Sequence, residues 1–229
     1  MIIGINGNDA NTQPRVGVGQ YAFELLRHFS PKDKIVYLNH PPMADMPKLV
    51  YKVFGPKRLW TFTGLQKEIL LHPPDVLFTP THYAPLFLTC PSVISIMDLA
   101  FEKFPQYFKP RDLYQLKYWS RLSASQAARI LTISENSKKD IVEIYKVPEN
   151  KVVVTYPGYD KDRFNLKVKK STKYGKYLLF LGTLQPRKNI ERLIEAYSQL
   201  KTDCKLVIVG MINEGRGGWM NEKIKATEN

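Results

Sequence analysis

The sequence predicts a doubly wound α/β protein built on a parallel sheet, followed by the beginning of a second unit of the same kind. Short apolar runs alternate along the chain with longer amphipathic stretches. Two of the runs, 75–78 and 93–96, have the apolar character of strands that are buried on both faces of a parallel sheet. After a polar, basic stretch at 166–176, the same alternation starts again.

The first part of the chain carries most of the expected elements. Apolar side chains at helical spacing predict a helix over 18–29. Pro110 precedes a long helix at 111–128, and Ser134 is a suitable N-cap for a helix at 135–145. A further helix is expected at 57–71. Strands are expected at 2–5, 35–38, 49–54, 75–78, 93–96, 130–133 and 151–155. Together these elements predict a domain over 1–165.

The stretch 166–176 (LKVKKSTKYGK) is almost without apolar residues, which is typical of a linker between domains. The residues after it, 177–229, predict an incomplete second domain. A strand at 177–181, a helix at 189–200 and a strand at 205–209 form a βαβ unit, and the chain ends about one helix later, at 219–229. Such a unit buries little apolar surface, so we expect it to lean on the first domain or to belong to a longer protein.

The composition is globular, with 44% hydrophobic residues, and it is strongly basic. Lys and Arg number 34 against 21 Asp and Glu, so the net charge is +13. This excess favours an anionic partner, such as nucleic acid, anionic lipid or a phosphorylated substrate, but it also fits a generally basic surface without a specific partner.

Cysteines and histidines give no sign of a metal site. Cys90 and Cys204 are far apart and are expected to be free thiols in a reducing compartment, and the four histidines are scattered along the chain. The first residues lack the basic leader of a signal peptide, and no stretch approaches the ~18 apolar residues of a membrane-spanning helix. These features predict a cytoplasmic protein that could touch a membrane from the inner side.

Two loops are candidate phosphate sites. Gly17 and Gly19 stand between the first expected strand and the first helix, where glycines let the backbone approach a ligand and the helix start favours an anion. The loop lacks the third glycine of the dinucleotide fingerprint, so a simple flexible turn is the alternative. Arg187 and Lys188 follow the strand at 177–181, and at this sheet edge two cations could hold a diphosphate. Their alternative is a solvated surface pair.

Asp98 is the candidate catalytic residue, because it lies just past the buried run at 93–96 and could contact an acceptor hydroxyl. Its alternative is to cap the next turn. The helix at 111–128 combines Tyr114, Tyr118 and Trp119 with basic residues, a pattern that suits an anionic membrane surface or, alternatively, packing into the core.

The order of these motifs resembles the retaining glycosyltransferases of family 4, also called group 1, over almost the whole chain. The similar segments are GVGQYAFELL, DVLFTP, PSVISIMDLAFEKFPQYF, RILTISENSKKDIVEIY, KVVVTYPGYDKDRF and YLLFLGTLQPRKNIERLIEAY. The last of these is the most specific and resembles mannosyltransferase-like members.

The resemblance implies a GT-B fold, with two facing Rossmann-like domains and the site in the cleft between them. It implies a nucleotide-diphosphate sugar as donor, a glycan or lipid-linked acceptor, retention of anomeric configuration, and neither a metal nor another cofactor. Arg187 and Lys188 fall on the family's diphosphate-binding pair, and Gly17 and Gly19 on its donor-phosphate loop. Asp98 falls on the Asp of the family's His-Asp pair.

Two departures from the family pattern stand out. Met97 replaces the histidine before Asp98, and a thioether cannot donate a hydrogen bond to a sugar hydroxyl. The family's paired glutamates, which hold the nucleotide ribose and the donor sugar, would follow beyond Asn229. We therefore expect little or no transferase activity from residues 1–229 alone.

Two other classes of protein compete with this interpretation. A basic binding module without catalysis, for nucleic acid or an anionic membrane, would use the +13 charge and the aromatic helix. No helix-turn-helix, zinc or RNP signature supports nucleic acid as a partner. A different α/β enzyme with a phosphate site, such as a dehydrogenase, would need the missing third glycine and an acidic residue at the end of a second strand.

Overall fold

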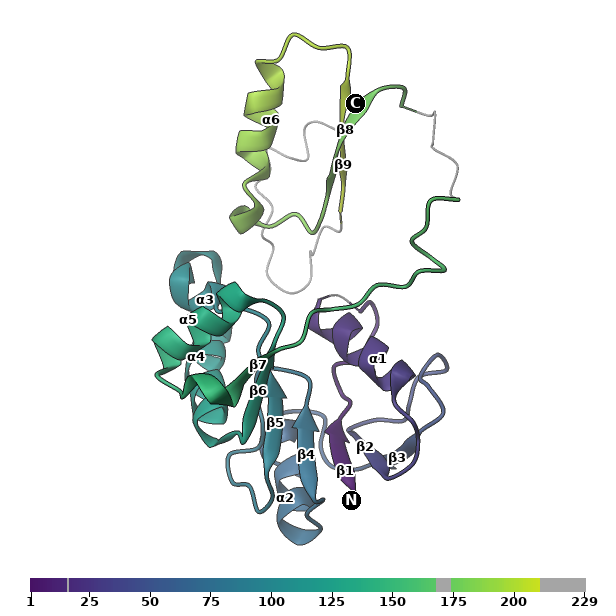
Figure 1. Cartoon of the computed structure of the whole chain (residues 1–229), viewed down its shortest axis with the longest axis vertical. Coiled ribbons are helices and arrows are strands. Elements are labelled where there is room, and N and C mark those ends of the chain that lie inside the picture. Colours follow the sequence, from purple (N-terminus) through teal and green to yellow (C-terminus); the bar gives the residue numbers. More distant parts are fainter. Residues whose placement is uncertain (16, 168–173, 211–229) are drawn as a thin grey trace. The chain divides into compact units, whose positions relative to one another are not determined.

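The computed structural model describes residues 1–15, 17–167 and 174–210. The chain divides into two compact units, Met1–Gly158 and Tyr159–Asn229 (Figure 1). None of the described helices is long and apolar enough to cross a membrane. Both Cys90 and Cys204 are free thiols, as the sequence predicts.

The first unit contains a seven-stranded sheet in which every neighbouring pair of strands is parallel, with the order β3-β2-β1-β4-β5-β6-β7. Its strands are β1 (Ile3–Asn6), β2 (Lys34–Leu38), β3 (Val50–Val53), β4 (Val76–Thr79), β5 (Ser92–Ser95), β6 (Arg129–Thr132) and β7 (Val152–Val154). Its α-helices are α1 (Val18–His28), α2 (Gly64–Leu71), α3 (Ala100–Lys103), α4 (Pro110–Gln126) and α5 (Glu135–Tyr145). Short 3-10 turns are η1 (Trp60–Phe62), η2 (Pro105–Tyr107) and η3 (Glu149–Lys151). The predicted parallel α/β class is confirmed.

The strand order reverses in the middle of this sheet. β1 pairs with both β2 and β4, so the chain first runs outward through β2 and β3 and then restarts at β4 toward the opposite edge. In open α/β sheets, ligands bind beyond the carboxyl ends of the strands at such a reversal. The loops that follow β1 and β4 are therefore the first place to look for a site.

Helices cover both faces of the sheet. Phe78 of β4 belongs to the same buried cluster as Leu26 of α1. Its neighbour Leu77 points to the opposite face, because side chains alternate along a strand, and it packs in a cluster with Leu65 and Ile69 of α2. A third cluster joins β5, β6 and β7 to α4 and α5 through Ile94, Ile130, Val152, Ala124 and Ile141.

Most predicted boundaries are confirmed. The Ser134 side chain accepts a hydrogen bond from the Ser137 N–H at 3.1 Å, and α5 spans Glu135–Tyr145 as predicted. The strands predicted at 177–181 and 205–209 also have their predicted bounds, and the other elements differ by at most two residues at either end, with the exception of the helix at 57–71. The short helix α3 was not predicted.

The prediction of a continuous helix from residue 57 is wrong. Leu59 has a left-handed φ of 50°, and α2 begins only at Gly64. The Trp60 indole N–H donates to the Phe54 carbonyl at 2.7 Å, and a Cβ on Gly64 would lie 2.7 Å from the Trp60 ring. The burial of this tryptophan against Phe54 and α2 therefore takes precedence over the local helical pattern.

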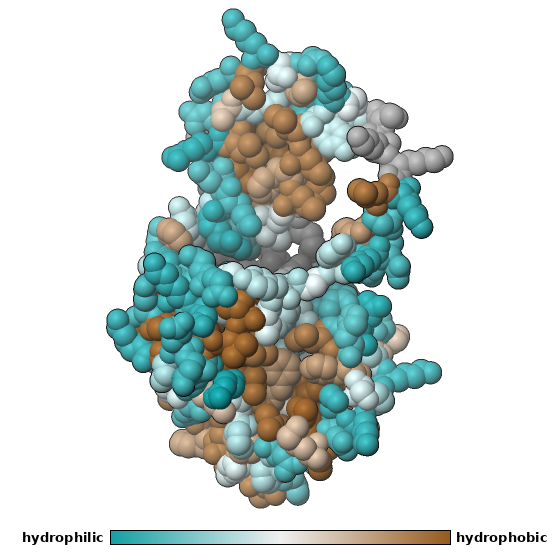
Figure 2. Space-filling view, in the orientation of Figure 1, coloured by the Kyte–Doolittle hydropathy of each residue, from teal (hydrophilic) through white to brown (hydrophobic). Residues whose placement is uncertain are grey.

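The second unit is a βαβ motif, which confirms the predicted order of strand, helix and strand. β8 (Tyr177–Leu181) pairs in parallel with β9 (Lys205–Val209), and the turn η4 (Pro186–Lys188) and helix α6 (Ile190–Ser198) connect them. Leu178, Leu179 and Leu181 are 46%, 56% and 75% exposed, and Figure 2 shows a large apolar area on this unit. The predicted chain end at 219–229 and residues 168–173 of the predicted linker lie outside the described residues.

Candidate functional site

The loops after β1, β4 and β5 all lie at the carboxyl edge of the first sheet, around the reversal of strand order. They carry Gly17 and Gly19, then His82 and Tyr83, then Asp98. Because these strands are parallel neighbours, the three loops form one side of the unit. Two predicted site groups, the glycines and Asp98, are therefore placed at the same edge.

The loop after β1 brings its backbone close to the start of α1. Gly17 has a φ of 51°, in the left-handed region that favours glycine, and α1 begins directly after it without a side-chain cap. A Cβ on Gly19 would lie 2.8 Å from the Asp9 carbonyl oxygen, so this position is closely packed. An uncapped helix start leaves backbone N–H groups available to an anion. The predicted phosphate-binding role of both glycines stays a prediction. Val16, which connects Arg15 to Gly17, lies outside the described residues.

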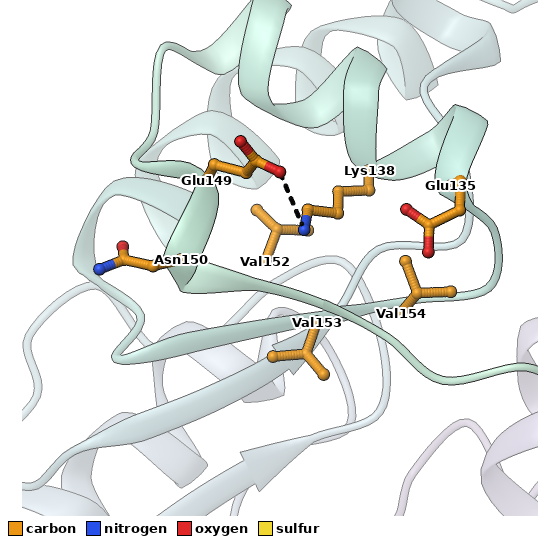
Figure 3. A pocket seen from close by; sticks show the side chains of 7 residues that line it. All are labelled: Glu135, Lys138, Glu149, Asn150, Val152, Val153 and Val154. Atoms are coloured by element: carbon orange, nitrogen blue, oxygen red, sulfur yellow. Dashed lines mark ion pairs between the residues drawn. The ribbon is translucent and has the colours of Figure 1, made fainter.

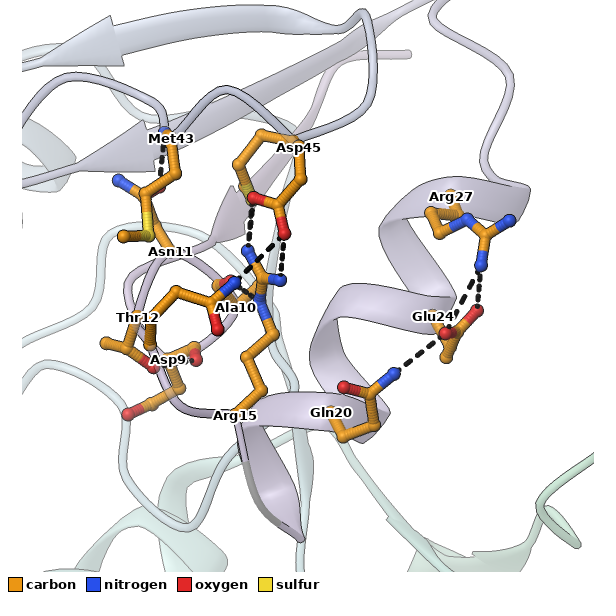
Figure 4. A network of polar contacts seen from close by, with 12 residues as sticks. Asp9, Ala10, Asn11, Thr12, Arg15, Gln20, Glu24, Arg27, Met43 and Asp45 are labelled. Carbon is orange, nitrogen blue, oxygen red and sulfur yellow. Dashed lines mark hydrogen bonds and ion pairs between the residues drawn. The ribbon is translucent and has the colours of Figure 1, made fainter.

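Arg15 anchors this loop to the segment after β2, an arrangement that the sequence did not indicate. Its guanidinium pairs with both carboxylate oxygens of Asp45, at 2.5 and 2.9 Å, and its side chain is only 6% exposed (Figure 4). Arg15 also donates to the Ala10 carbonyl and lies 3.9 Å from the centre of the Phe23 ring of α1. The hydrogen bond from Arg15 lowers the pKa of Asp45 below its usual value. Arg15 thus links the loop after β1 to the segment after β2 and to helix α1.

Asn11 makes a second anchor in the same loop. Its side chain is fully buried, its amide donates to the carbonyls of His40 and Pro41, and its Oδ1 accepts the Met43 N–H at 2.8 Å. Figure 4 shows Asn11 and Arg15 reaching toward the same neighbouring segment. The part of the loop up to Arg15 is therefore anchored to the segment after β2 at two points.

The loop after β4 is held by α4. The Ala84 N–H donates to the Ser123 hydroxyl at 3.0 Å, and the Tyr83 ring packs edge-on against Trp119 at 5.8 Å. Burial, together with the negative charges of Asp9 and Asp112, raises the pKa of Tyr83 to about 12. The loops after β1 and β4 lie at the same end of two neighbouring strands, since β1 and β4 pair in parallel.

His82 precedes Tyr83 and was not singled out from the sequence. Its Nδ1 is buried without a hydrogen-bond partner in the described part of the chain. Burial lowers the pKa of His82, and the nearby Asp98 carboxylate partly offsets this effect by raising it. The only sequence signal was its position, three residues after the end of a buried strand.

Asp98 caps a turn, which is the alternative that the sequence left open. Its Oδ1 accepts the Ala100 N–H at 3.0 Å at the beginning of α3. The residue is exposed, and no ion pair involves its carboxylate within the described residues. The cap leaves Oδ2 available, so capping and substrate contact are compatible. The predicted catalytic role stays a prediction.

Arg187 and Lys188 lie in η4 of the second unit, between the carboxyl end of β8 and α6. Both are exposed, and Arg187 Nε donates to the Gln185 side chain at 3.0 Å. Asn189, with a left-handed φ of 53°, begins the turn into α6. The two cations are thus placed at a carboxyl sheet edge, as predicted, but in a different unit from the glycines. Their meeting across a cleft stays a prediction.

A hollow beside the edge strand β7 contains none of the predicted site residues (Figure 3). Lys138 of α5 and Glu149 of η3 form an ion pair across it at 3.2 Å. The hollow lies along β7, which is an edge strand of the sheet, and we assign it no functional role. In the described ranges, no group of three or more His, Cys, Asp or Glu side chains is arranged to hold a metal ion.

Two sequence families match the chain. Residues 16–163 match the family described as Glycosyltransferase Family 4, and residues 161–229 match Glycosyl transferases group 1. The chain is 24% identical, over 91% of its own length, to the O-antigen chain mannosyltransferase B of Escherichia coli. It is 33% identical, over 41% of its length, to N-acetylgalactosamine-N,N'-diacetylbacillosaminyl-diphospho-undecaprenol 4-alpha-N-acetylgalactosaminyltransferase of Campylobacter jejuni.

The solved structures include a glycosyltransferase from Rickettsia africae with the same fold. The match has a TM-score of 0.50 at 17% identity and covers 93% of this chain. The chain spans 63% of the length of the E. coli protein, 26% of the C. jejuni protein and 60% of the R. africae structure.

Proposed function

The chain belongs to glycosyltransferase family 4, and on that basis we propose that it takes part in transfer of a hexose, with mannose as the first candidate, from a nucleotide-diphosphate sugar to a glycan or lipid-linked acceptor with retention of configuration. The E. coli relative is named as a mannosyltransferase, and the name of the C. jejuni relative includes a diphospho-undecaprenol. These names supply the candidate sugar and the candidate class of acceptor.

The observation that carries this proposal is the anchored loop after β1. Arg15 and Asn11 anchor it, the space beside Gly17 is open, Gly19 packs closely against the Asp9 carbonyl, and the uncapped start of α1 follows Gly17 directly. A loop of this kind at the strand-order reversal suits the phosphates of a donor.

The chemistry requires stabilisation of a leaving diphosphate. When the bond between the anomeric carbon and the phosphate oxygen breaks, negative charge builds up on the diphosphate. We assign its stabilisation to the guanidinium of Arg187, the ammonium of Lys188 and the N–H groups at the start of α1, without a metal ion. Asp98, whose Oδ2 is not used by the turn cap, is assigned to a substrate hydroxyl.

Binding of nucleotide sugars by the purified chain tests this proposal. We expect GDP-mannose or a UDP-sugar to bind detectably in saturation-transfer NMR, and to bind more weakly as salt is added, because the diphosphate contacts are ionic. We expect little sugar transfer by residues 1–229 alone, because the described second unit leaves its strands largely exposed. Absence of binding for every nucleotide sugar would contradict the donor site, and robust transfer would contradict the expected inactivity.

Helix α4 supports a second element of the proposal, which is contact with an anionic membrane. Its outer stripe carries Tyr114, Tyr118 and Leu122, which are 59%, 61% and 40% exposed, and the two tyrosine rings lie 4.5 Å apart. Arg111 and Arg121 are exposed on the same helix. Exposed aromatic side chains flanked by cations suit the headgroup region of a membrane that holds a lipid-linked acceptor.

Replacement of both tyrosines, Tyr114→Ser with Tyr118→Ser, is expected to weaken vesicle binding roughly tenfold, or by about 1.4 kcal/mol. The measurement is co-sedimentation with phosphatidylcholine vesicles containing phosphatidylglycerol. Tyr156→Ser is the matched control, because Tyr156 is 70% exposed in the same unit but does not lie on α4. Equal binding by all variants would rule out α4 as the contact surface. Steeply salt-dependent binding of DNA would favour the nucleic-acid alternative instead.

A further inference from the structure

His82 is a polar group at the carboxyl edge that the assignments above leave unused. Its ring packs edge-on against Phe101, with the ring centres 5.9 Å apart and an interplanar angle of 85°. Phe101 is only 2% exposed, and the neighbouring Ala84 N–H is fixed to Ser123 of α4. The ring of His82 is therefore held in place by the core rather than free on a loop tip.

The two ring nitrogens of His82 have different surroundings. Nδ1 is buried and has no hydrogen-bond partner among the described residues. No hydrogen bond of Nε2 is found there either, and the residue as a whole is partly exposed, so the exposed part of His82 does not include Nδ1. A buried N–H without an acceptor is rarer in proteins than a buried acceptor without a donor. This asymmetry favours the tautomer in which Nδ1 is unprotonated and Nε2 carries the proton.

Asp98 lies on the next loop of the same edge, because β4 and β5 are paired, and it caps the start of α3, the helix whose Phe101 packs against the His82 ring. Its carboxylate acts electrostatically on that ring. Asp98 supplies an acceptor, since one of its oxygens remains outside the turn cap. Met97, next to Asp98, has no N–H or O–H in its side chain to complement that acceptor. A sugar hydroxyl both donates and accepts, so it needs one group of each kind.

We propose that His82 Nε2–H and the Asp98 carboxylate together bind one hydroxyl group of a hexose. His82 donates a hydrogen bond to the hydroxyl oxygen, and Asp98 accepts a hydrogen bond from the hydroxyl O–H. This inference rests on the proposed sugar-transfer function. The hexose is either the one carried by the donor or one at the end of the acceptor. In both cases His82 is a substrate-binding residue that acts in this chain where Met97 cannot.

The tautomer of His82 is the first test. Long-range ¹H–¹⁵N NMR spectra of the full chain, with His82 assigned by its loss in His82→Gln, distinguish protonation at Nε2 from protonation at Nδ1. We expect the neutral Nε2–H form near pH 7, because burial lowers the pKa of this histidine. A neutral Nδ1–H form would overturn the proposal, whether or not the chain binds nucleotides.

Sugar binding is the second test, with methyl α-D-mannopyranoside, GDP and GDP-mannose as probes. Loss of one neutral hydrogen bond in His82→Phe is expected to weaken sugar binding about threefold to tenfold, and His82→Gln, which keeps a donor, is expected to recover part of it. His72→Gln is the control, because His72 is exposed at the end of α2.

The probes separate the two sources of the hexose. A weaker affinity for GDP-mannose with unchanged affinity for GDP assigns the hydroxyl to the donor. A weaker affinity for the methyl mannoside alone assigns it to the acceptor. Unchanged affinity for both sugars in His82→Phe overturns the proposal. If the wild-type chain binds the mannoside through His82 but binds neither GDP nor GDP-mannose, the proposed donor function is contradicted and this inference is supported.

Discussion

Replacing Arg187 and Lys188 together by alanine is expected to weaken the binding of a nucleoside diphosphate by 100-fold or more. A hydrogen bond to a charged group contributes about 1.5–3 kcal/mol, and each tenfold change in affinity corresponds to about 1.4 kcal/mol. Two such contacts with a diphosphate therefore account for a loss of this size. Isothermal titration of GDP or UDP into the wild-type and variant chains measures it.

The position of the two residues makes this a test of binding rather than of folding. Both are exposed in η4, and within the described residues their side chains make one hydrogen bond, from Arg187 to Gln185 in the same turn. Substitution at such sites changes stability by about 0.5 kcal/mol or less. Lys201→Ala removes an exposed charge from the same unit and serves as the control for net charge. If the double variant and the control bind equally, the diphosphate assignment fails.

Replacing Arg15 by methionine is expected to lower the unfolding free energy of the first unit by about 2–3 kcal/mol. The substitution removes the paired hydrogen bonds to Asp45, the hydrogen bond to the Ala10 carbonyl, and the contact with the Phe23 ring. The Asp45 side chain is 46% exposed and can return to water, so the loss should stay below that of a fully buried ion pair. Urea denaturation measures the change.

Arg27→Met is the matched control, because Arg27 also pairs with a carboxylate, that of Glu24 at 3.1 Å. Both side chains are substantially exposed, at 48% and 38%, and such pairs contribute about 0–1 kcal/mol. In Arg15→Met the pKa of Asp45 should also rise toward its ordinary value, since the Arg15 hydrogen bond is the main cause that lowers it. Equal stability of the two variants would show that Arg15 does not anchor the loop.

If Arg15→Met loosens the loop after β1, this variant should also bind the sugar donor less tightly. Arg15 does not itself contact a phosphate in this interpretation, because its guanidinium is already occupied by Asp45. Its loss would increase the freedom of the backbone that leads into Gly17 and Gly19. The effect on donor affinity would then follow from the ordering entropy of the loop, not from a missing charge on the ligand.

Local sequence patterns predicted most of the secondary structure of this protein and its family. The serine before α5 and the periodicity of 135–145 involve only near neighbours in the chain, and the structure reproduces both. The alternation of apolar runs and amphipathic stretches predicted the strands, the parallel class and the βαβ motif at 177–209. The motifs around Gly17 and Asp98 indicated the family that matches residues 16–163, and the motif around Arg187 lies in the second match, at 161–229.

Contacts between distant segments could not be predicted in the same way. Trp60 determines where α2 begins because it packs against Phe54 and Gly64 in the folded unit. The helical periodicity of the sequence does not reveal this packing. Arg15 and Asp45 are 30 residues apart, and their pairing requires β1 and β2 to lie side by side. His82 and Asp98 follow different strands and lie on adjacent loops only because β4 and β5 are neighbours.

The sequence alone thus determined which segments form strands and helices and which loops carry candidate chemistry, since these depend on the order and spacing of adjacent side chains. Tertiary structure decided the strand order, the anchor of the glycine loop and the placement of His82 and Asp98 on neighbouring loops. The physical reason is that hydrophobic periodicity shows which face of an element is buried, but not which distant element covers it or which polar groups meet there.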